Sequence, residues 1–479
     1  MRFNLRHIVP FALLSLMGCG AETPVDQEQQ PVVAEELGQT QSMLRVSLNP
    51  SCLGGTEGTR FLSDFEREQV TGDIAHYSIR LQVGPNAARD VVTLHRVVKE
   101  KFPWVPKKSR ESLFMVHGDA WDFRGAFMTS TLTKTVAADH SIAVYLAERG
   151  VDVWGIDLRW TQVPLETQDF SFMKGWNLGT HAQDVGVGMT VARAVRALTG
   201  SGTDKMNLLG WSRGAVVSYA YMNAETQLPQ SLRNVSGFIP VDMVMKFGPE
   251  AEQQRQWACT RAAVGEMILQ GGRYEGNLSG NGAGVLIMQV GMAAGAWPNA
   301  VAQVPGIELP PQTTYGQLGV AVGAATHTFL SNAAAGIQPV VPGYHFAAGS
   351  FDPNNSLTGL QYVGSQQFFD FLSAAHPYQS FTEVVESEQL QCGVKDLPYD
   401  DHLSKVKVPV LYVGAAGGFG TYGEYVVKNL LGSKDVTIHQ VQRLPDAYRA
   451  ADYGHADLFL ASDAEKTVWA PIYEWMKKH

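Results

Sequence analysis

The sequence has little cysteine, little charge and no long apolar run. Only 4 of its 479 residues are cysteine, and no two of them have the C-x-x-C spacing that is typical of a structural zinc site. This scarcity argues against a disulfide-rich fold and against a zinc-dependent fold. The core is therefore expected to depend on packing alone.

Charged residues make up 17% of the chain, with 37 Lys and Arg against 46 Asp and Glu, which gives a net charge of −9. There is no basic cluster, so nucleic acid is not an expected partner. Hydrophobic residues make up 45%, which excludes disorder over most of the length. The length fits about three domain-sized units or one large domain with an insertion.

The amino terminus has the three parts of a bacterial secretory signal. Two arginines precede the apolar run Ile8–Leu16, and Gly18 precedes Cys19. The run is shorter than the roughly 20 residues of a spanning helix. Residues 1–19 resemble a lipoprotein signal, which implies lipid (palmitate) modification of Cys19, membrane attachment and a periplasmic or surface location in the bacterial envelope. An ordinary cleaved signal is the alternative.

Residues 20–42 contain no Lys, Arg or aromatic residue and are rich in Gln, Glu and Pro. Such a segment buries too little apolar area to offset the entropy of ordering it. We expect a flexible tether there. A short amphipathic helix around Ala34 is the alternative.

The pattern in the rest of the chain is that of an α/β protein. Alternating segments predict half-buried antiparallel strands at the entry to a sheet: Met43–Leu48, Ile74–Val83 and Asp90–Val98. Short apolar runs then predict buried, mostly parallel strands: Leu113–Val116, Val151–Ile156, Met206–Leu209, Val235–Val241, Val408–Val413 and Val436–Val441. Helical patterns such as Ile142–Arg149 and His181–Leu198 lie between them.

The alternation stops between about Met245 and Asp401. This stretch is dense in Gly and Ala and has few charges, which predicts a mainly helical insertion packed through small side chains. We therefore divide the folded part into a first core segment (43–244), a cap insertion (245–402) and a second core segment (403–479).

A Gly-x-Ser-x-Gly string, Gly210-Trp-Ser212-Arg-Gly214, lies between the predicted strand Met206–Leu209 and the predicted helix Ala215–Glu225. A nucleophile on so sharp a strand-to-helix turn has small residues two positions to either side, because the backbone approaches closely there. The helix amino terminus also favours developing negative charge. Ser212 is thus the candidate nucleophile.

With these residues the sequence resembles the α/β-hydrolase family of serine esterases and lipases, over Leu113–Asp242 and from Lys407 to the end but not over the insertion. The resemblance implies an α/β-hydrolase fold with a mostly parallel central sheet and a large cap. It also implies an oxyanion hole made by the main-chain amides of Asp119 or Ala120, after the His117-Gly118 pair, and of Arg213. His117 and Asp157, in Asp157-Leu-Arg159, are expected to have structural parts.

The resemblance places the general base in a histidine late in the chain. His455, in Tyr-Gly-His-Ala-Asp-Leu-Phe near the end, looks like the histidine loop of lipase-like members. His402, at the exit of the insertion, and His439, inside a predicted strand, are the competitors.

The triad acid departs from the usual pattern. Most members carry it after the seventh strand, where this chain has Gly417 and Gly418. Some carry it after the sixth, where Asp242 follows Val241, and we predict Asp242 as the acid. Glu424 is the main alternative, and Asp446, Asp457 or the lack of any triad acid are the remaining ones. A purely structural role for Asp242, as the N-cap of a helix, is the alternative to a catalytic one.

Two further groups remain open. A disulfide between Cys259 and Cys392 would tie together the two ends of the insertion, but Cys52 would then be left over if Cys19 is acylated. A solvated loop explains the acidic residues Asp396, Asp400 and Asp401 near His402 better than a metal site, because their spacing matches no known ligand pattern.

Together these features predict a membrane-anchored serine hydrolase that cleaves carboxylic esters, with no cofactor and no metal. The low charge of the cap suggests an apolar substrate, although helical packing explains it equally well. A thioesterase, lactonase or peptidase on the same triad is one alternative, and a non-catalytic surface lipoprotein with a binding cap is another. The sequence leaves the oligomeric state, the acyl chain length and the membrane leaflet open.

Overall fold

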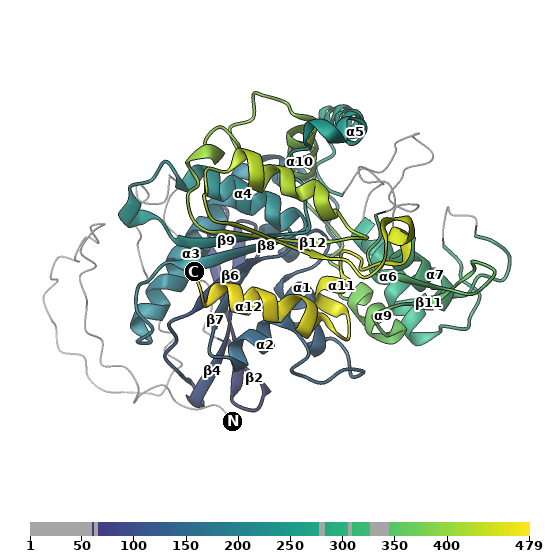
Figure 1. Cartoon of the computed structure of the whole chain (residues 1–479), viewed down its shortest axis with the longest axis horizontal. Helices are drawn as coiled ribbons and strands as arrows, with labels where there is room; N and C mark the ends of the chain where they lie inside the picture. The colour runs from purple at the N-terminus through teal and green to yellow at the C-terminus, as the bar shows by residue number, and fades with distance from the viewer. Residues whose placement is uncertain (1–59, 62–65, 277–282, 305–308, 326–343) are drawn as a thin grey trace, which may run out of the picture.

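The computed structural model describes residues 60–61, 66–276, 283–304, 309–325 and 344–479 (Figure 1). The predicted signal segment with Cys19, the tether, the strand Met43–Leu48 and Cys52 lie outside the described residues.

A twisted sheet of eleven strands runs through the molecule in the order β1-β3-β4-β7-β6-β8-β9-β12-β13, with β2 paired to β3 and β5 to β4. From β7 to β13 all neighbours are parallel, whereas the pairs β1–β3, β3–β4 and β4–β7 are antiparallel. The bounds are Arg60–Phe61 (β1), Glu66–Thr71 (β2), Ile74–Gln82 (β3), Val91–Phe102 (β4), Val105–Pro106 (β5), Ser112–Val116 (β6), Asp152–Asp157 (β7), Met206–Trp211 (β8), Val235–Val241 (β9), Val410–Ala415 (β12) and Val436–Val441 (β13).

Helices cover both faces of this sheet (Figure 1). One core lies between the sheet and helices α3 (Leu178–Leu198) and α4 (Arg213–Glu225). The other lies between the sheet and helices α1 (Phe123–Phe127), α2 (Ile142–Glu148), α11 (Asp457–Leu460) and α12 (Ala470–Met476). The predicted α/β class, with a mostly parallel central sheet flanked by helices, is confirmed.

The prediction that the strands at the entry of the sheet are half-buried was wrong. Strand β4 is buried from Val91 to Val98, and β3 is buried at most positions. The reason is that β4 lies between β3 and β7 in the interior of the sheet, where helices cover both faces. Polar members such as His95 and Arg96 are buried with partners, since His95 contacts Asp157 and Arg96 contacts Asp152.

Between β9 and β12 the chain forms two groups of elements (Figure 1). Helices α5 (Glu252–Gln270) and α10 (Phe381–Cys392) pack against each other and form the first group. The second group contains α6 (Ala283–Ala296), α7 (Tyr315–Ala324), α9 (Ser365–Ser373) and a hairpin of β10 (Gly349–Phe351) and β11 (Leu357–Leu360). The sequence pattern had not indicated the hairpin.

Small side chains set the spacing within the second group, as the Gly-rich and Ala-rich composition predicted. A Cβ on Gly319 would lie 2.6 Å from the ring of Phe369, and one on Gly323 would lie 2.8 Å from the ring of Phe368. On α6, a Cβ at Gly291 would lie 2.7 Å from the main chain of Leu372. Helices α6 and α7 can therefore approach α9 closely because these positions carry no side chain.

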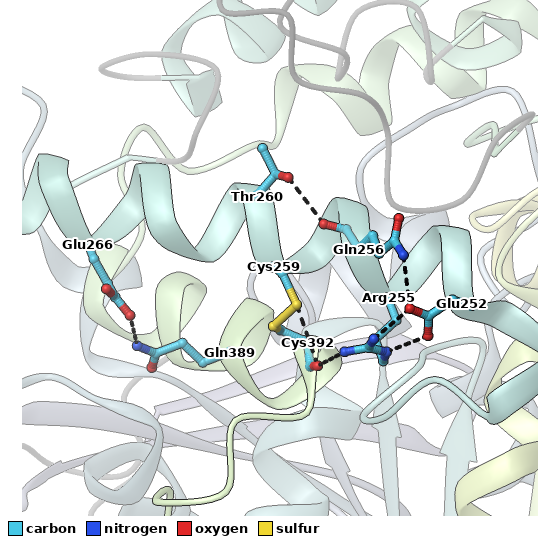
Figure 2. Close-up of a disulfide and its surroundings, with 8 residues drawn as sticks. All are labelled: Glu252, Arg255, Gln256, Cys259, Thr260, Glu266, Gln389 and Cys392. Atoms are coloured by element: carbon cyan, nitrogen blue, oxygen red, sulfur yellow. Dashed lines mark hydrogen bonds and ion pairs between the residues drawn. A yellow bond between two sulfur atoms is a disulfide. The ribbon is translucent and has the colours of Figure 1, made fainter.

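The first group contains the disulfide that the sequence left open, between Cys259 on α5 and Cys392 at the end of α10 (Figure 2). Arg255 Nη1 donates to the Cys392 carbonyl oxygen at 3.2 Å, and the side-chain amide of Gln389 donates to Glu266 at 2.6 Å. The disulfide joins residues 133 positions apart and so fixes α5, the first helix of the insertion, to α10, its last.

Within the described residues, no helix is both long enough and apolar enough to cross a bilayer.

Candidate active site

Ser212 lies on a sharp turn between β8 and α4. Its backbone has φ 56° and ψ −135°, a combination that residues other than glycine rarely adopt. The flanking glycines are needed for steric reasons: a Cβ on Gly210 would lie 2.7 Å from the main chain of Ala215, and one on Gly214 would overlap the carbonyl oxygens of Val116 and His117. The turn thus presents a half-buried Ser212 at the carboxyl edge of the sheet, before the amino terminus of α4.

Asp242 follows β9, the neighbour of β8, and its side chain is fully buried. Its Oδ1 accepts hydrogen bonds from the amides of Ala415 at 2.8 Å and Gly420 at 2.9 Å, and its Oδ2 accepts one from Phe419 at 3.2 Å. The carboxylate is therefore held by main-chain donors from the end of β12. It does not cap a helix, which was the alternative, purely structural role considered for Asp242.

The glycines after β12 leave the space that the Asp242 carboxylate occupies. A Cβ on Gly418 would overlap Asp242 Oδ2 and lie 2.9 Å from its Cγ, and a Cβ on Gly417 would overlap the ring of His345. At the site where an acid was expected after this strand, the chain has no side chain. The carboxylate reaches that space from the neighbouring strand.

His455 lies in the loop after β13, and its ring is fully buried. Its Nδ1 is 2.7 Å from Asp242 Oδ2, which requires the proton on Nδ1 when Asp242 is ionised. Its Nε2 is buried and has no hydrogen-bond partner among the described residues. The ring stacks on Trp211, the residue before Ser212, with ring centroids 5.0 Å apart.

Three more aromatic rings surround His455: Tyr344 at 5.4 Å, Phe346 at 5.5 Å and Phe419 at 5.7 Å between centroids. The first two belong to the insertion. The same insertion segment bonds to the histidine loop through the main chain, since the amides of His455 and Ala456 donate to the carbonyl oxygens of His345 and Phe346 at 3.1 and 2.7 Å. The insertion therefore forms one wall of the site.

The predicted oxyanion segment lies directly against the nucleophile turn. A Cβ on Gly118 would be 2.5 Å from the Cβ of Ser212 and 3.1 Å from its Oγ. Ala120 has a φ of 66°, which turns the chain sharply at this point. The main-chain amides of Asp119, Ala120 and Arg213 donate to no acceptor among the described residues.

The residues that were expected to have structural parts make matching contacts. His117 Nε2 accepts a hydrogen bond from the amide of Leu158 at 3.1 Å, and burial lowers the pKa of this histidine, which favours the neutral form. The Asp157 carboxylate accepts the amide of Phe123 at 2.8 Å. Arg159 bonds to Asp184 and Asp90, each at 2.6 Å. These contacts hold the loops that flank the site.

The competing histidines lie elsewhere. His439 has its Nε2 2.6 Å from the carbonyl oxygen of Thr467, and the main-chain amide of His402 donates to the side chain of Asn223, a buried residue of α4. Among the described residues, neither histidine forms a hydrogen bond with Ser212 or Asp242.

The competing acids also have other partners. Glu424 pairs with Lys428 and accepts a hydrogen bond from Gln440 at 2.8 Å, and Asp446 accepts one from Gln442 at 2.8 Å. Asp457 Oδ2 accepts the amides of Gly454 and Ala348, at 2.8 and 2.7 Å. Of the four predicted acids, Asp242 alone contacts His455 within the described part of the chain.

Asp457 is nevertheless unusual. Desolvation by complete burial raises its pKa to about 7, although the two amide hydrogen bonds act in the opposite direction. It ties the histidine loop, through Gly454, to the insertion, through Ala348. The sequence had offered it only as a minor candidate for the triad acid.

The acidic residues at the exit of the insertion form no metal centre among the described residues, where no group of three or more His, Cys, Asp or Glu side chains converges. Asp400 instead pairs with Lys246.

The sequence did not indicate Tyr344 and Phe346, the insertion residues whose rings lie beside His455. They follow no periodic pattern and lie more than 100 positions before His455.

No family model matches this chain, and no curated protein matches it in sequence. Among solved structures it is similar to a candidate lipase from Sulfolobus solfataricus, with 16% identity over 87% of this chain and 99% of that chain and a TM-score of 0.55. A soluble variant of monoglyceride lipase from Saccharomyces cerevisiae (12% identity, 87% and 95% covered) and an α/β hydrolase fold protein from Nakamurella multipartita (12%, 81% and 96%) both have a TM-score of 0.39.

At 16% identity, the likeness to the Sulfolobus protein concerns the fold alone.

Proposed function

Since this chain has the α/β-hydrolase fold, we propose that it is a serine hydrolase that cleaves carboxylic esters through an acyl-enzyme. One observation carries the proposal: Asp242 and His455 are 2.7 Å apart in a buried pair whose imidazole stacks beside the turn that bears Ser212. A carboxylate, an imidazole and a serine in this relation form the arrangement used for acyl transfer.

In the proposed reaction, Ser212 Oγ attacks the ester carbonyl carbon while His455 Nε2 takes the hydroxyl proton. Asp242 holds the other ring nitrogen, which fixes the tautomer and stabilises the imidazolium. The carbonyl electron pair moves onto the oxygen, where the amides of Arg213 and of Asp119 or Ala120 would bind it. Collapse expels the alcohol, protonated by His455. A water molecule activated by the same histidine then releases the acid and regenerates Ser212.

The aromatic rings around His455 and the low charge of the insertion support an apolar substrate. Trp211, Tyr344, Phe346 and Phe419 exclude water from the imidazole and would favour an apolar acyl or alcohol group beside it. A thioester, lactone or peptide substrate on the same triad is the second candidate. A panel of short and long acyl esters, thioesters, lactones and peptides assayed side by side would rank these classes.

The direct test is labelling with a fluorophosphonate probe, which reacts with an activated serine. We expect the label on the peptide that contains Ser212. Ser212→Ala should lose labelling and several orders of magnitude in turnover while keeping its folded circular dichroism spectrum. Ser350→Ala, on β10, is the matched control and should behave like the wild type. Near-normal hydrolysis by folded Ser212→Ala would overturn Ser212 as the nucleophile. A wild-type protein that neither reacts with the probe nor hydrolyses any ester would favour a non-catalytic binding protein instead.

We also propose that the mature protein is anchored in the bacterial envelope by a lipid on Cys19. The support is the signal-like sequence of residues 1–19 alone. Mass spectrometry of the membrane fraction should find a lipid-modified Cys19 at the mature terminus, and Cys19→Ser should block that processing. An unmodified Cys19, or a terminus elsewhere, would remove the anchor.

A further inference from the structure

An ion pair links the two chain segments that carry the candidate oxyanion amides. Arg213 Nε donates to Asp119 Oδ1 at 2.7 Å, between the residue after Ser212 and the residue after Gly118. The Arg213 side chain is 11% exposed and that of Asp119 is 34% exposed. The bond thus lies at the rim of the site, and the guanidinium is buried behind it.

The two segments touch at three consecutive positions. Gly118 packs directly against Ser212, and Gly214 packs against the carbonyl oxygens of Val116 and His117. Between these two contacts, Arg213 donates a hydrogen bond to Asp119. The two glycine contacts fix how close the backbones come. The ion pair is the one side-chain bond across this junction, within the described residues, that can fix how the two backbones are turned relative to each other.

Burial alone would lower the pKa of Arg213, but the nearby carboxylates of Asp119, Glu383 and Glu388 outweigh it and raise that pKa. Arg213 therefore stays charged at any working pH. Glu383 and Glu388 come from α10 of the insertion, so the guanidinium lies between acids of the core and of the insertion. The ion pair that joins the Asp119 segment to the Arg213 segment therefore contains a guanidinium that stays protonated.

Given the ester-hydrolase function proposed above, we propose that Asp119 and Arg213 form a positioning pair that aligns the amides of the oxyanion hole. Neither side chain takes part in proton transfer. The pair keeps the amide of Arg213 and that of Asp119 or Ala120 aimed at the same point beside Ser212. Its loss would weaken the binding of the oxyanion more than the binding of the neutral ester.

The test compares Asp119→Asn and Asp119→Ala with wild type for kcat, KM and the affinity for a boronic acid, which forms a tetrahedral anion on an active serine. Asparagine keeps the shape and removes the charge. Removing an oxyanion donor outright costs about 10²–10³-fold in kcat, so we expect misalignment to cost about 10–100-fold, with KM within about threefold of wild type. Boronate affinity should fall in proportion to kcat, and Asp119→Glu should recover part of both.

Asp152→Asn is the matched control, because Asp152 forms a buried ion pair with Arg96 at the opposite end of the sheet. It should lower the melting temperature and leave kcat per folded molecule unchanged.

Unchanged kcat and boronate affinity in Asp119→Asn would overturn the positioning role. A faster Asp119→Asn enzyme would overturn it too, since an unpaired Arg213 would then be acting on the oxyanion by its charge alone. If wild type itself fails to react with the fluorophosphonate or to cleave any ester, the proposed function fails instead.

Discussion

The ends of β9 and β12 lie side by side, with Val241 paired to Val413, yet they contribute to the site in opposite ways. The β9 end supplies a carboxylate, Asp242. The β12 end supplies glycines and three main-chain amides that surround that carboxylate. The acid therefore occupies a space between the two strand ends, which a side chain from either strand could fill but which both cannot share.

Removing the charge from the β9 end should have the strongest effect on the site. Asp242→Asn keeps the shape but favours the wrong tautomer of His455, and the equivalent change in a serine protease lowers kcat about 10⁴-fold. We expect Asp242→Asn to lose at least about a hundredfold in kcat. Steady-state kinetics on a short-chain ester would measure it.

Glu424→Gln is the control from the β12 end, because Glu424 bonds to Lys428 and Gln440 rather than to His455. It should lose less than about tenfold in kcat. The reverse ranking of the two variants would move the acid to Glu424.

A smaller effect is expected from crowding the shared space. In Gly418→Ala the new methyl group would meet Asp242 Oδ2, so the carboxylate or the loop has to shift. We expect about a tenfold loss in kcat and a loss of about 1–3 kcal/mol in the free energy of unfolding. Gly364→Ala is a suitable control, since a Cβ there meets no atom within 4 Å. Equal activity of both variants would show that the space tolerates a side chain.

The smallest effect concerns a second buried carboxyl group, Asp457, which has two amide donors where Asp242 has three. Its pKa is raised to about 7 in the folded protein, against about 3.9 in an unfolded chain. The unfolded state therefore releases this proton at lower pH, and the stability contributed by the group falls as pH rises from about 4 to about 7.

Asp457→Asn should remove that dependence. The free energy of unfolding, measured with urea, should therefore shift in favour of the variant: between pH 5 and pH 8 the variant should gain about 3 kcal/mol of stability relative to wild type. A difference that does not change with pH would show that Asp457 stays ionised in the folded state.

The local parts of the site could be predicted from the sequence. The turn at Ser212 depends on neighbours within a few positions, and each buried parallel strand has its own apolar run, as in β8 and β9. The choice of Asp242 was reasoned from the missing acid at Gly417 and Gly418. The reason for the glycines, which is room for that same carboxylate, required the coordinates.

Features that depend on distant pairs could not be predicted in the same way. Strand β4 has an alternating sequence, but its place between β3 and β7 buries both faces, so its polar residues pair internally. The bond between Asp119 and Arg213 joins positions 94 residues apart with no periodic signal. Tyr344 and Phe346 reach His455 only because the insertion returns to the sheet edge before β10.

The main-chain bonds between residues 345–348 and the histidine loop also bear on modularity. The insertion interrupts the hydrolase core in sequence, as a separable module would, yet His455, Ala456 and Asp457 all take hydrogen-bond partners from it. Excising it would leave those groups exposed or unpaired and would open the imidazole to water. Swapping this insertion between related enzymes would therefore exchange part of the catalytic framework together with the substrate-facing surface.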